Sequence, residues 1–193
     1  MNKFVKTLLV TAALGLVGTT VIAPSAYAAM AAMGTKMVGG AAMYPTKNII
    51  ENALNSKDHT TLVAAVKAAG LVDTLEGKGP FTVFAPTNEA FAALPKGTVD
   101  NLLKPENKAM LVKILTAHVL AGHYDVADLK AAAKTAGGSV AMKTVSGNSL
   151  TFMIKGSVFY VVDESGGAAK ITIGDVEQSN GVIQVVNKVL LPK

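Results

Sequence analysis

The stretch Phe81-Thr-Val-Phe-Ala-Pro-Thr-Asn-Glu-Ala-Phe91 decides how this chain folds, together with a second apolar block, Asn180-Gly-Val-Ile-Gln-Val-Val-Asn-Lys-Val-Leu-Leu-Pro192. The first block predicts a buried strand that breaks at Pro86 and turns directly into a short helix, because proline cannot donate a hydrogen bond to a sheet. The second block predicts a turn followed by a strand that ends the domain. Core positions are expected for Phe81, Val83, Phe84 and Phe91.

Helical patterns flank the first block. Thr46 is expected to cap one helix, and a second follows Asp58 and stops at Gly70. After the block, Pro105 opens the longest helix, whose apolar face runs from Leu111 to His118. A further short helix is expected to begin at Asp125.

From residue 137 onward the pattern changes to short β-rich runs separated by glycine-containing turns, which predicts a series of hairpins. The expected strands cover residues 139–144, 149–154, 158–162 and 171–176. Helices come first and strands later, without βαβ alternation, and no internal repeat is present. The sequence therefore predicts a single α+β domain.

The N-terminus indicates export. Residues 1–28 combine a basic start, an apolar run over residues 8–17 and the small-x-small site Ala26-Tyr27-Ala28, the pattern of a secretory signal peptide cut after Ala28. The alternative, an uncleaved anchor, is disfavoured because the run is short and interrupted. We therefore expect a secreted or periplasmic protein with no stable membrane insertion after cleavage.

Residues 29–45, rich in Ala, Gly and Met, lack a clear period and are predicted to form a flexible leader, with the domain proper at residues 46–193. Methionine thioethers can bind Cu(I), but the spacing of Met30, Met33, Met37 and Met43 is irregular and no histidine lies among them. The leader therefore predicts no metal site.

The charged residues argue against a nucleic-acid partner. All 18 basic residues are lysines, and cleavage of the signal peptide leaves 16 of them against 13 acidic residues. Without arginine the chain lacks the bidentate fork that phosphate and base recognition favour. Scattered lysines leave weak attraction to an anionic polysaccharide or a membrane surface open. No cysteine is present, so no disulfide contributes to stability.

Residues 46 to 192 resemble the fasciclin-like family of extracellular adhesion domains. The segment Thr82–Phe91 is similar to the first family box, and Leu115-Thr-Ala-His-Val-Leu-Ala-Gly122 to the central segment, with Ala117 in place of the usual Tyr and His118 retained. The segment beginning Asn180-Gly181 is similar to the second box. The resemblance implies an α+β fasciclin-like fold: a sheet wedge or sandwich from the C-terminal strands, with short helices of the N-terminal half packed against it.

The second box departs from the family pattern at Gln184 and Asn187, where the common form has His and Asp. These replacements keep hydrogen-bonding capacity but do not titrate near neutral pH. They favour a structural polar network, comprising Asn88, His118, Gln184 and Asn187, over acid–base catalysis. His118 is interpreted as a core histidine held by hydrogen bonds, with a ligand or contact role as the alternative.

Asp175 and Val176 form the candidate binding site. They match the place where animal fasciclin-like domains carry an Asp-Ile pair implicated in integrin contact. An acid beside an apolar residue can bind a receptor-held metal ion while the apolar side chain packs. The alternative interpretation is a strand-end aspartate flanked by a core valine.

No catalytic pattern is apparent, and we expect no enzyme activity. The chain has no Gly-x-Ser-x-Gly elbow and no phosphate-binding loop before a helix. The three histidines, His59, His118 and His123, share no short spacing, so the sequence predicts no zinc site and no cofactor.

The leading hypothesis is an adhesion or interaction module that binds a cell-surface protein or polysaccharide. A single module bridges surfaces only if it self-associates or has two binding faces. The second hypothesis is a binding protein for a small apolar or lipid-like ligand, suggested by the high apolar content and by a helix layer against a sheet.

Overall fold

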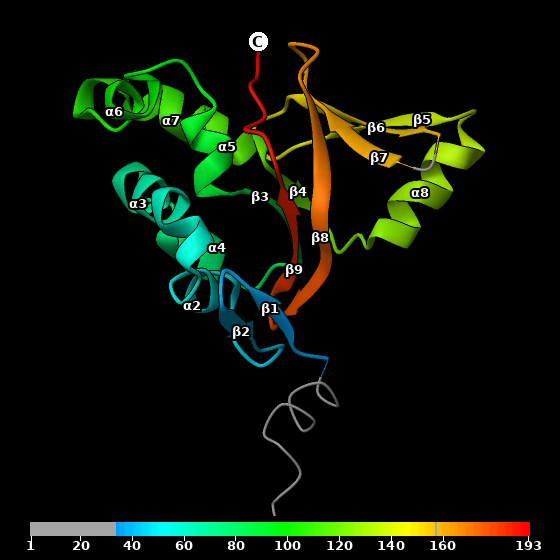
Figure 1. Ribbon diagram of the computed structural model, residues 1–193, viewed down its shortest axis with the longest axis horizontal. Coiled ribbons are helices and arrows are strands. Elements are labelled where there is room, and N and C mark those ends of the chain that lie inside the picture. Colours follow the sequence, from blue (N-terminus) through cyan, green and yellow to red (C-terminus); the bar gives the residue numbers. More distant parts are fainter. Residues whose placement is uncertain (1–33, 157) are drawn as a thin grey trace, which may run out of the picture.

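The computed structural model describes residues 34–156 and 158–193 (Figure 1). The signal-peptide prediction for residues 1–28 falls outside these residues. The helices are α2 (Ile49–Ala53), η1 (Lys57–His59), α3 (Thr60–Ala69), α4 (Val72–Glu76), α5 (Asn88–Ala92), α6 (Thr98–Leu102), η2 (Pro105–Asn107), α7 (Lys108–Ala117) and α8 (Val126–Thr135). The strands are β1 (Lys36–Val38), β2 (Ala41–Met43), β3 (Phe81–Pro86), β4 (Val119–Ala121), β5 (Ser139–Lys143), β6 (Ser149–Lys155), β7 (Val158–Val162), β8 (Ala168–Gln178) and β9 (Gly181–Val186).

Seven strands form one sheet in the order β4-β3-β9-β8-β7-β6-β5. The two sequence blocks lie side by side in it, because β3 pairs with β9 in parallel from Phe81 opposite Gly181 to Pro86 opposite Val186. All other pairs are antiparallel, and β5 to β8 form the predicted hairpin series. The α+β fold predicted from the sequence is confirmed.

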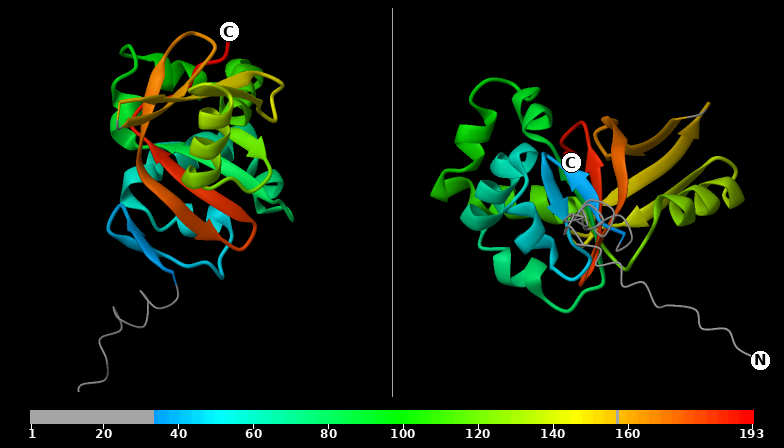
Figure 2. Two further views of the ribbon diagram at one scale, coloured as in Figure 1. Left: turned by 90° about the vertical axis from the view of Figure 1, so that its right-hand side faces the viewer. Right: turned by 60° about the horizontal axis from the view of Figure 1, so that its bottom comes forward.

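The sheet separates two apolar cores. Figures 1 and 2 show α2 to α7 on one side of β3 and β9, and β5 to β7 with α8 on the other. Successive side chains of β3 point to opposite faces of the sheet and so contribute to both cores. Val83 packs in the helix-side core, whereas Phe84 packs in the α8-side core. In the second core the ring of Phe84 lies 5.4 Å from that of Phe152, centroid to centroid. Each ring buried in this way contributes roughly 1.5–3 kcal/mol.

Several element boundaries differ from the sequence prediction. Asn48, not Thr46, caps α2, and its side chain accepts from the Glu51 N–H in a reciprocal capping box. Gly70 ends α3 as predicted, in a left-handed conformation with φ 73°. The longest predicted helix stops at Ala117, because His118 is its C-terminal cap and leads straight into β4, which the sequence did not indicate.

The prediction of a flexible leader over residues 29–45 is wrong for its described part. Residues 36–43 form the hairpin β1–β2, and the side chains of Val38 and Met43 are buried in the helix-side core. The hairpin turn is docked on η1, where the Lys57 N–H donates to the Gly39 carbonyl at 3.2 Å. The segment folds because these two side chains are buried and because the glycines between the strands permit a tight turn. It is too short to show a hydrophobic period in the sequence.

Within residues 34–156 and 158–193, no helix combines the length and the apolar character that crossing a membrane requires.

The turn before β9 joins the helix layer to the sheet. The Asn180 side chain is buried; its Oδ1 accepts from the Ile49 N–H at 3.0 Å, and its Nδ2 donates to the carbonyls of Leu75 and Gly77 at 2.7 and 2.9 Å. The next residue, Gly181, lies directly against Phe81. A Cβ there would overlap the Phe81 carbonyl oxygen and lie 2.8 Å from both the Phe81 nitrogen and its carbonyl carbon.

We predict that Gly181→Ala destabilises the domain by about 3 kcal/mol, because β3 and β9 must separate to accept the methyl group. Chemical denaturation monitored by circular dichroism measures this change. Gly147→Ala is the matched control: Gly147 also has positive φ, 83°, but open space around it, so about 1 kcal/mol is expected. Equal losses in the two variants would contradict the close-approach explanation.

His118 joins the two sequence blocks through two of its three hydrogen bonds. Its carbonyl accepts from the Phe84 N–H at 2.8 Å, and its Nε2 accepts from the Leu190 N–H at 2.9 Å. Because Nε2 is an acceptor, the proton lies on Nδ1, which donates to the Ile114 carbonyl at 2.8 Å. Burial lowers the pKa of His118 to about 4, although the Ile114 carbonyl opposes the shift.

This lowered pKa predicts acid destabilisation. The histidine pKa is about 6.5 in the unfolded chain and about 4 in the folded one, so its contribution is complete above pH 6.5 and is lost as the pH falls toward 4. The loss is up to about 3 kcal/mol. We expect His118→Gln, which retains a donor and an acceptor, to flatten the stability profile between pH 6.5 and 4 relative to the parent protein. Parallel profiles would contradict this prediction.

Candidate functional site

Strand β8 is irregular where it passes the start of α8. Its pairing with β9 shifts register twice, between Ile171 and Ile173 and between Ile173 and Val176. Asp175 lies in the second irregularity with φ 54°, a conformation that side-chain-bearing residues seldom adopt. Because β8 pairs with β7 only over residues 168–170, the two strands diverge beyond Lys170.

The Asp175 side chain ties this bulge to α8. Its Oδ1 accepts from the Val126 N–H at 2.7 Å and from Gln184 Nε2 at 3.0 Å. Gln184 is fully buried, and its Oε1 accepts from the Asp175 N–H at 2.9 Å. Its Nε2 also donates to the Tyr124 carbonyl at 3.3 Å. A neutral amide thus holds β8, β9 and the loop before α8 together.

The same loop is held from β3. Thr82, fully buried, donates its hydroxyl to the Gly122 carbonyl at 2.8 Å and accepts from the Tyr124 N–H at 2.9 Å. These two bonds clamp the backbone on both sides of His123. Both sequence blocks therefore position the loop that carries His123 and Asp125, a role that the sequence analysis did not assign to Thr82.

The structure places Asp175 and Val176 differently from the contact pair suggested by the sequence. Val176 is 1% exposed and packs in the helix-side core, so its side chain cannot pack on a partner. Asp175 is half-buried, and its Oδ1 accepts two internal hydrogen bonds. The geometry fits the alternative interpretation, an aspartate of the strand flanked by a core valine.

The four polar residues expected to form a network lie at separate junctions. Asn88 accepts from the Thr61 N–H and donates to the Lys57 carbonyl, which fixes η1 and the start of α3. Asn187 Oδ1 accepts from the Lys170 N–H at 2.8 Å, where the end of β9 lies beside β8. Neither bonds to His118 or Gln184 among the described residues, so the expectation of one connected network is wrong.

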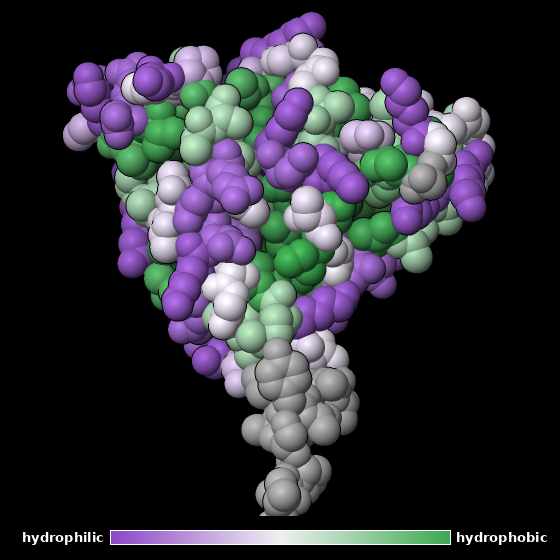
Figure 3. All heavy atoms as spheres, viewed as in Figure 1, coloured by the Kyte–Doolittle hydropathy of each residue, from purple (hydrophilic) through white to green (hydrophobic). Residues whose placement is uncertain are grey.

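An open groove of about 500 Å³ lies where β7 and β8 diverge beneath α8. Its apolar lining comes from Val126, Val158, Phe159 and Ile171, and its charged lining from Lys130, Lys170 and Asp175. The Lys130 ammonium lies 5.7 Å from the Phe159 ring centroid. Figure 3 shows apolar side chains reaching the surface between hydrophilic ones on the side of the molecule that carries β7 and β8.

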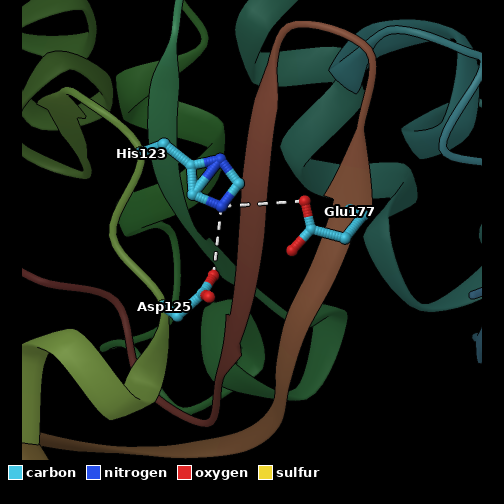
Figure 4. A group of neighbouring side chains, drawn as sticks. All are labelled: His123, Asp125 and Glu177. Carbon is cyan, nitrogen blue, oxygen red and sulfur yellow. Dashed lines mark hydrogen bonds and ion pairs between the residues drawn. The ribbon is translucent and has the colours of Figure 1, made fainter.

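Three residues of the metal-ligand type meet beside the bulge (Figure 4). His123 Nε2 lies 3.0 Å from Asp125 Oδ1 and 3.7 Å from Glu177 Oε2. Burial raises the pKa of Glu177, and the nearby Asp125 carboxylate adds to the shift. No short sequence spacing joins all three residues, because Glu177 lies in β8, far along the chain from the other two.

An apolar cavity of about 50 Å³ lies between the helix layer and the sheet. Side chains of the helix-side core form most of its wall, including Val38, Ile50 and Val83, and His59 and His118 reach its edge. Burial lowers the pKa of His59, whose Nδ1 lies 2.8 Å from Ser56 Oγ. Both histidines are therefore neutral parts of the core at physiological pH.

Comparison with known proteins agrees with this architecture. Residues 57–192 match the family model described as Fasciclin domain. Over 168 residues the chain is 47% identical to Protein sll1483 of Synechocystis, covering 85% of this chain and 86% of that protein. It is 34% identical over 171 residues to the Cell surface glycolipoprotein MPB83 of Mycobacterium bovis, covering 86% of this chain and 69% of that one.

The fold recurs in a solved structure, the FAS1 domain pair of the insect cell adhesion molecule fasciclin I, with a TM-score of 0.69 at 18% identity. The match covers 77% of this chain and 52% of that one. Together with the parallel pairing of the two sequence blocks, the family match and the bacterial relatives establish that this chain belongs to the fasciclin domain family.

Proposed function

We propose that the chain is an extracytoplasmic, non-enzymatic interaction module that binds an acidic polysaccharide at a cell surface through the groove between β7, β8 and α8. The observation that carries the proposal is the groove itself, about 500 Å³ in volume, whose lining combines four apolar side chains with two lysines. This volume is within the range of small-ligand sites and suits one or two sugar rings.

The charges of the groove favour an anion. Lys130 and Lys170 contribute two ammonium groups, whereas the one carboxylate in the lining, Asp175, already accepts hydrogen bonds from Val126 and Gln184. Lysine is a flexible point charge, suited to the carboxylates of a sugar chain without demanding one fixed geometry. The C–H faces of sugar rings would pack on Val158 and Ile171.

The N-terminal sequence and the relatives support an extracytoplasmic location. Residues 1–28 have the pattern of a secretory signal peptide, one relative is named a cell surface glycolipoprotein, and the structural neighbour is a cell adhesion molecule. One groove per chain bridges two surfaces only if the module self-associates. Analytical ultracentrifugation with and without polysaccharide measures that step.

The apolar cavity between the helix layer and the sheet supports the second candidate, a binding protein for an apolar or lipid-like ligand, less well. Its volume of about 50 Å³ is well below the 150 Å³ or so of an engineered cavity that admits benzene. A lipid chain would enter only if the helix layer moved away from the sheet. The groove, by contrast, has about ten times the volume of this cavity as it stands.

We predict that the double variant Lys130→Ala/Lys170→Ala lowers the affinity for polygalacturonate, used as the probe, by about tenfold, since two exposed ion pairs contribute roughly 0.2–1 kcal/mol each. Isothermal titration calorimetry at low salt measures the change, and added salt should weaken the parent protein more than the variant.

Lys96→Ala/Lys108→Ala is the matched control, because it removes the same charge from exposed positions on the helix layer, away from the groove. The control should bind as the parent protein does. If both double variants lose affinity equally, the attraction comes from net charge alone and the groove is not the site.

A further inference from the structure

We propose that His123, Asp125 and Glu177 form a binding site for a divalent transition-metal ion, with Zn²⁺ as the preferred occupant. One imidazole nitrogen and two carboxylate oxygens converge there from the loop after β4, the start of α8 and the strand β8 (Figure 4). None of these three residues lines the polysaccharide groove. The metal-site proposal therefore does not depend on the proposed polysaccharide binding.

The spacing of the three atoms fits a small ion. Ligands bound at about 2.0–2.1 Å in a tetrahedral arrangement lie roughly 3.3 Å from one another. The observed separations from His123 Nε2 are 3.0 Å to Asp125 Oδ1 and 3.7 Å to Glu177 Oε2, and all three atoms lie within 4.8 Å of one another. Small side-chain rotations suffice to bring them around one ion.

The backbone that carries these ligands is already fixed. Thr82 clamps Gly122 and Tyr124 on either side of His123. Asp125 caps α8, with its backbone N–H donating to Asp128. Glu177 pairs with Val182 in the β8–β9 ladder. Such preorganisation lowers the entropy that an ion must overcome to order its ligands.

The local charge also favours a cation. The groups facing Glu177 are the carboxylates of Asp125 and Asp175, the imidazole of His123 and the ammonium of Lys36, whose Nζ donates to the Gly174 carbonyl. Together with Glu177 itself, three carboxylates face one ammonium. A divalent ion would neutralise the excess and relieve the repulsion between Asp125 and Glu177.

The donor set selects the class of ion. Imidazole suits zinc and similar transition metals, whereas Ca²⁺ and Mg²⁺ prefer six or more oxygen ligands. Three protein ligands leave at least one coordination position of Zn²⁺ open toward solvent, because the side chains of all three residues are more than a third exposed.

The test is titration of tag-free mature protein with Zn²⁺ by isothermal titration calorimetry, with Co²⁺ absorption as a second readout because its visible bands report imidazole–carboxylate coordination. We expect one ion per chain. His123→Ala and Glu177→Gln should each lower the affinity more than tenfold. Asp125→Asn should do so too while keeping α8 capped, since asparagine is an equally good cap.

Glu106→Gln is the matched control, because it removes an exposed carboxylate on η2, remote from the cluster, and it should bind Zn²⁺ as the parent protein does. Binding of Ca²⁺ as tight as that of Zn²⁺, or unchanged Zn²⁺ affinity in His123→Ala, would overturn the proposal. Absence of stoichiometric binding would also overturn it and would leave the cluster as contacts of His123 with the two carboxylates that hold no ion.

Discussion

The parallel pairing of β3 with β9 is the constraint on which the rest of the structure depends. It brings together two blocks that are about a hundred residues apart in the chain, in register from Phe81 and Gly181 to Pro86 and Val186. A parallel pair needs a long connection, and here that connection contains α5 to α8 and five further strands. Closing so long a loop costs entropy, which the two cores on either side of the pair must offset.

Polar residues in and beside these two strands position the neighbouring turns and loops. Asn180 ties the turn before β9 to α2 and α4, Thr82 clamps the loop around His123, and Gln184 links that loop to the bulge in β8. Each is buried and hydrogen-bonded, as buried polar groups must be. The solvent-facing side chains that could bind a ligand are His123, Asp125, Glu177 and the groove lysines. The buried polar residues hold the segments that carry them.

The sequence sufficed for what depends on local pattern. Alternation and turn residues predicted the hairpin series, and Gly70 marked the end of α3, because both are decided within a few residues. It did not predict β4 or the β1–β2 hairpin, since three-residue strands show little period and are stabilised by pairing and burial. The sequence could not reveal the candidate site, because Glu177 comes within 3.7 Å of His123 only after β8 has folded back beside the loop.

Gln184 shows why a neutral residue suits the centre of this arrangement. Its amide oxygen, Oε1, accepts from the Asp175 N–H, and its amide nitrogen, Nε2, donates to both Asp175 Oδ1 and the Tyr124 carbonyl. An imidazole, common at this place in the family, could make one such bond with each nitrogen but would gain or lose a proton beside the Asp175 carboxylate. An amide makes all three bonds without changing charge. The shapes of the groove and of the neighbouring cluster therefore rest on a hydrogen-bonded centre whose donors and acceptors stay the same across the pH range in which histidine titrates.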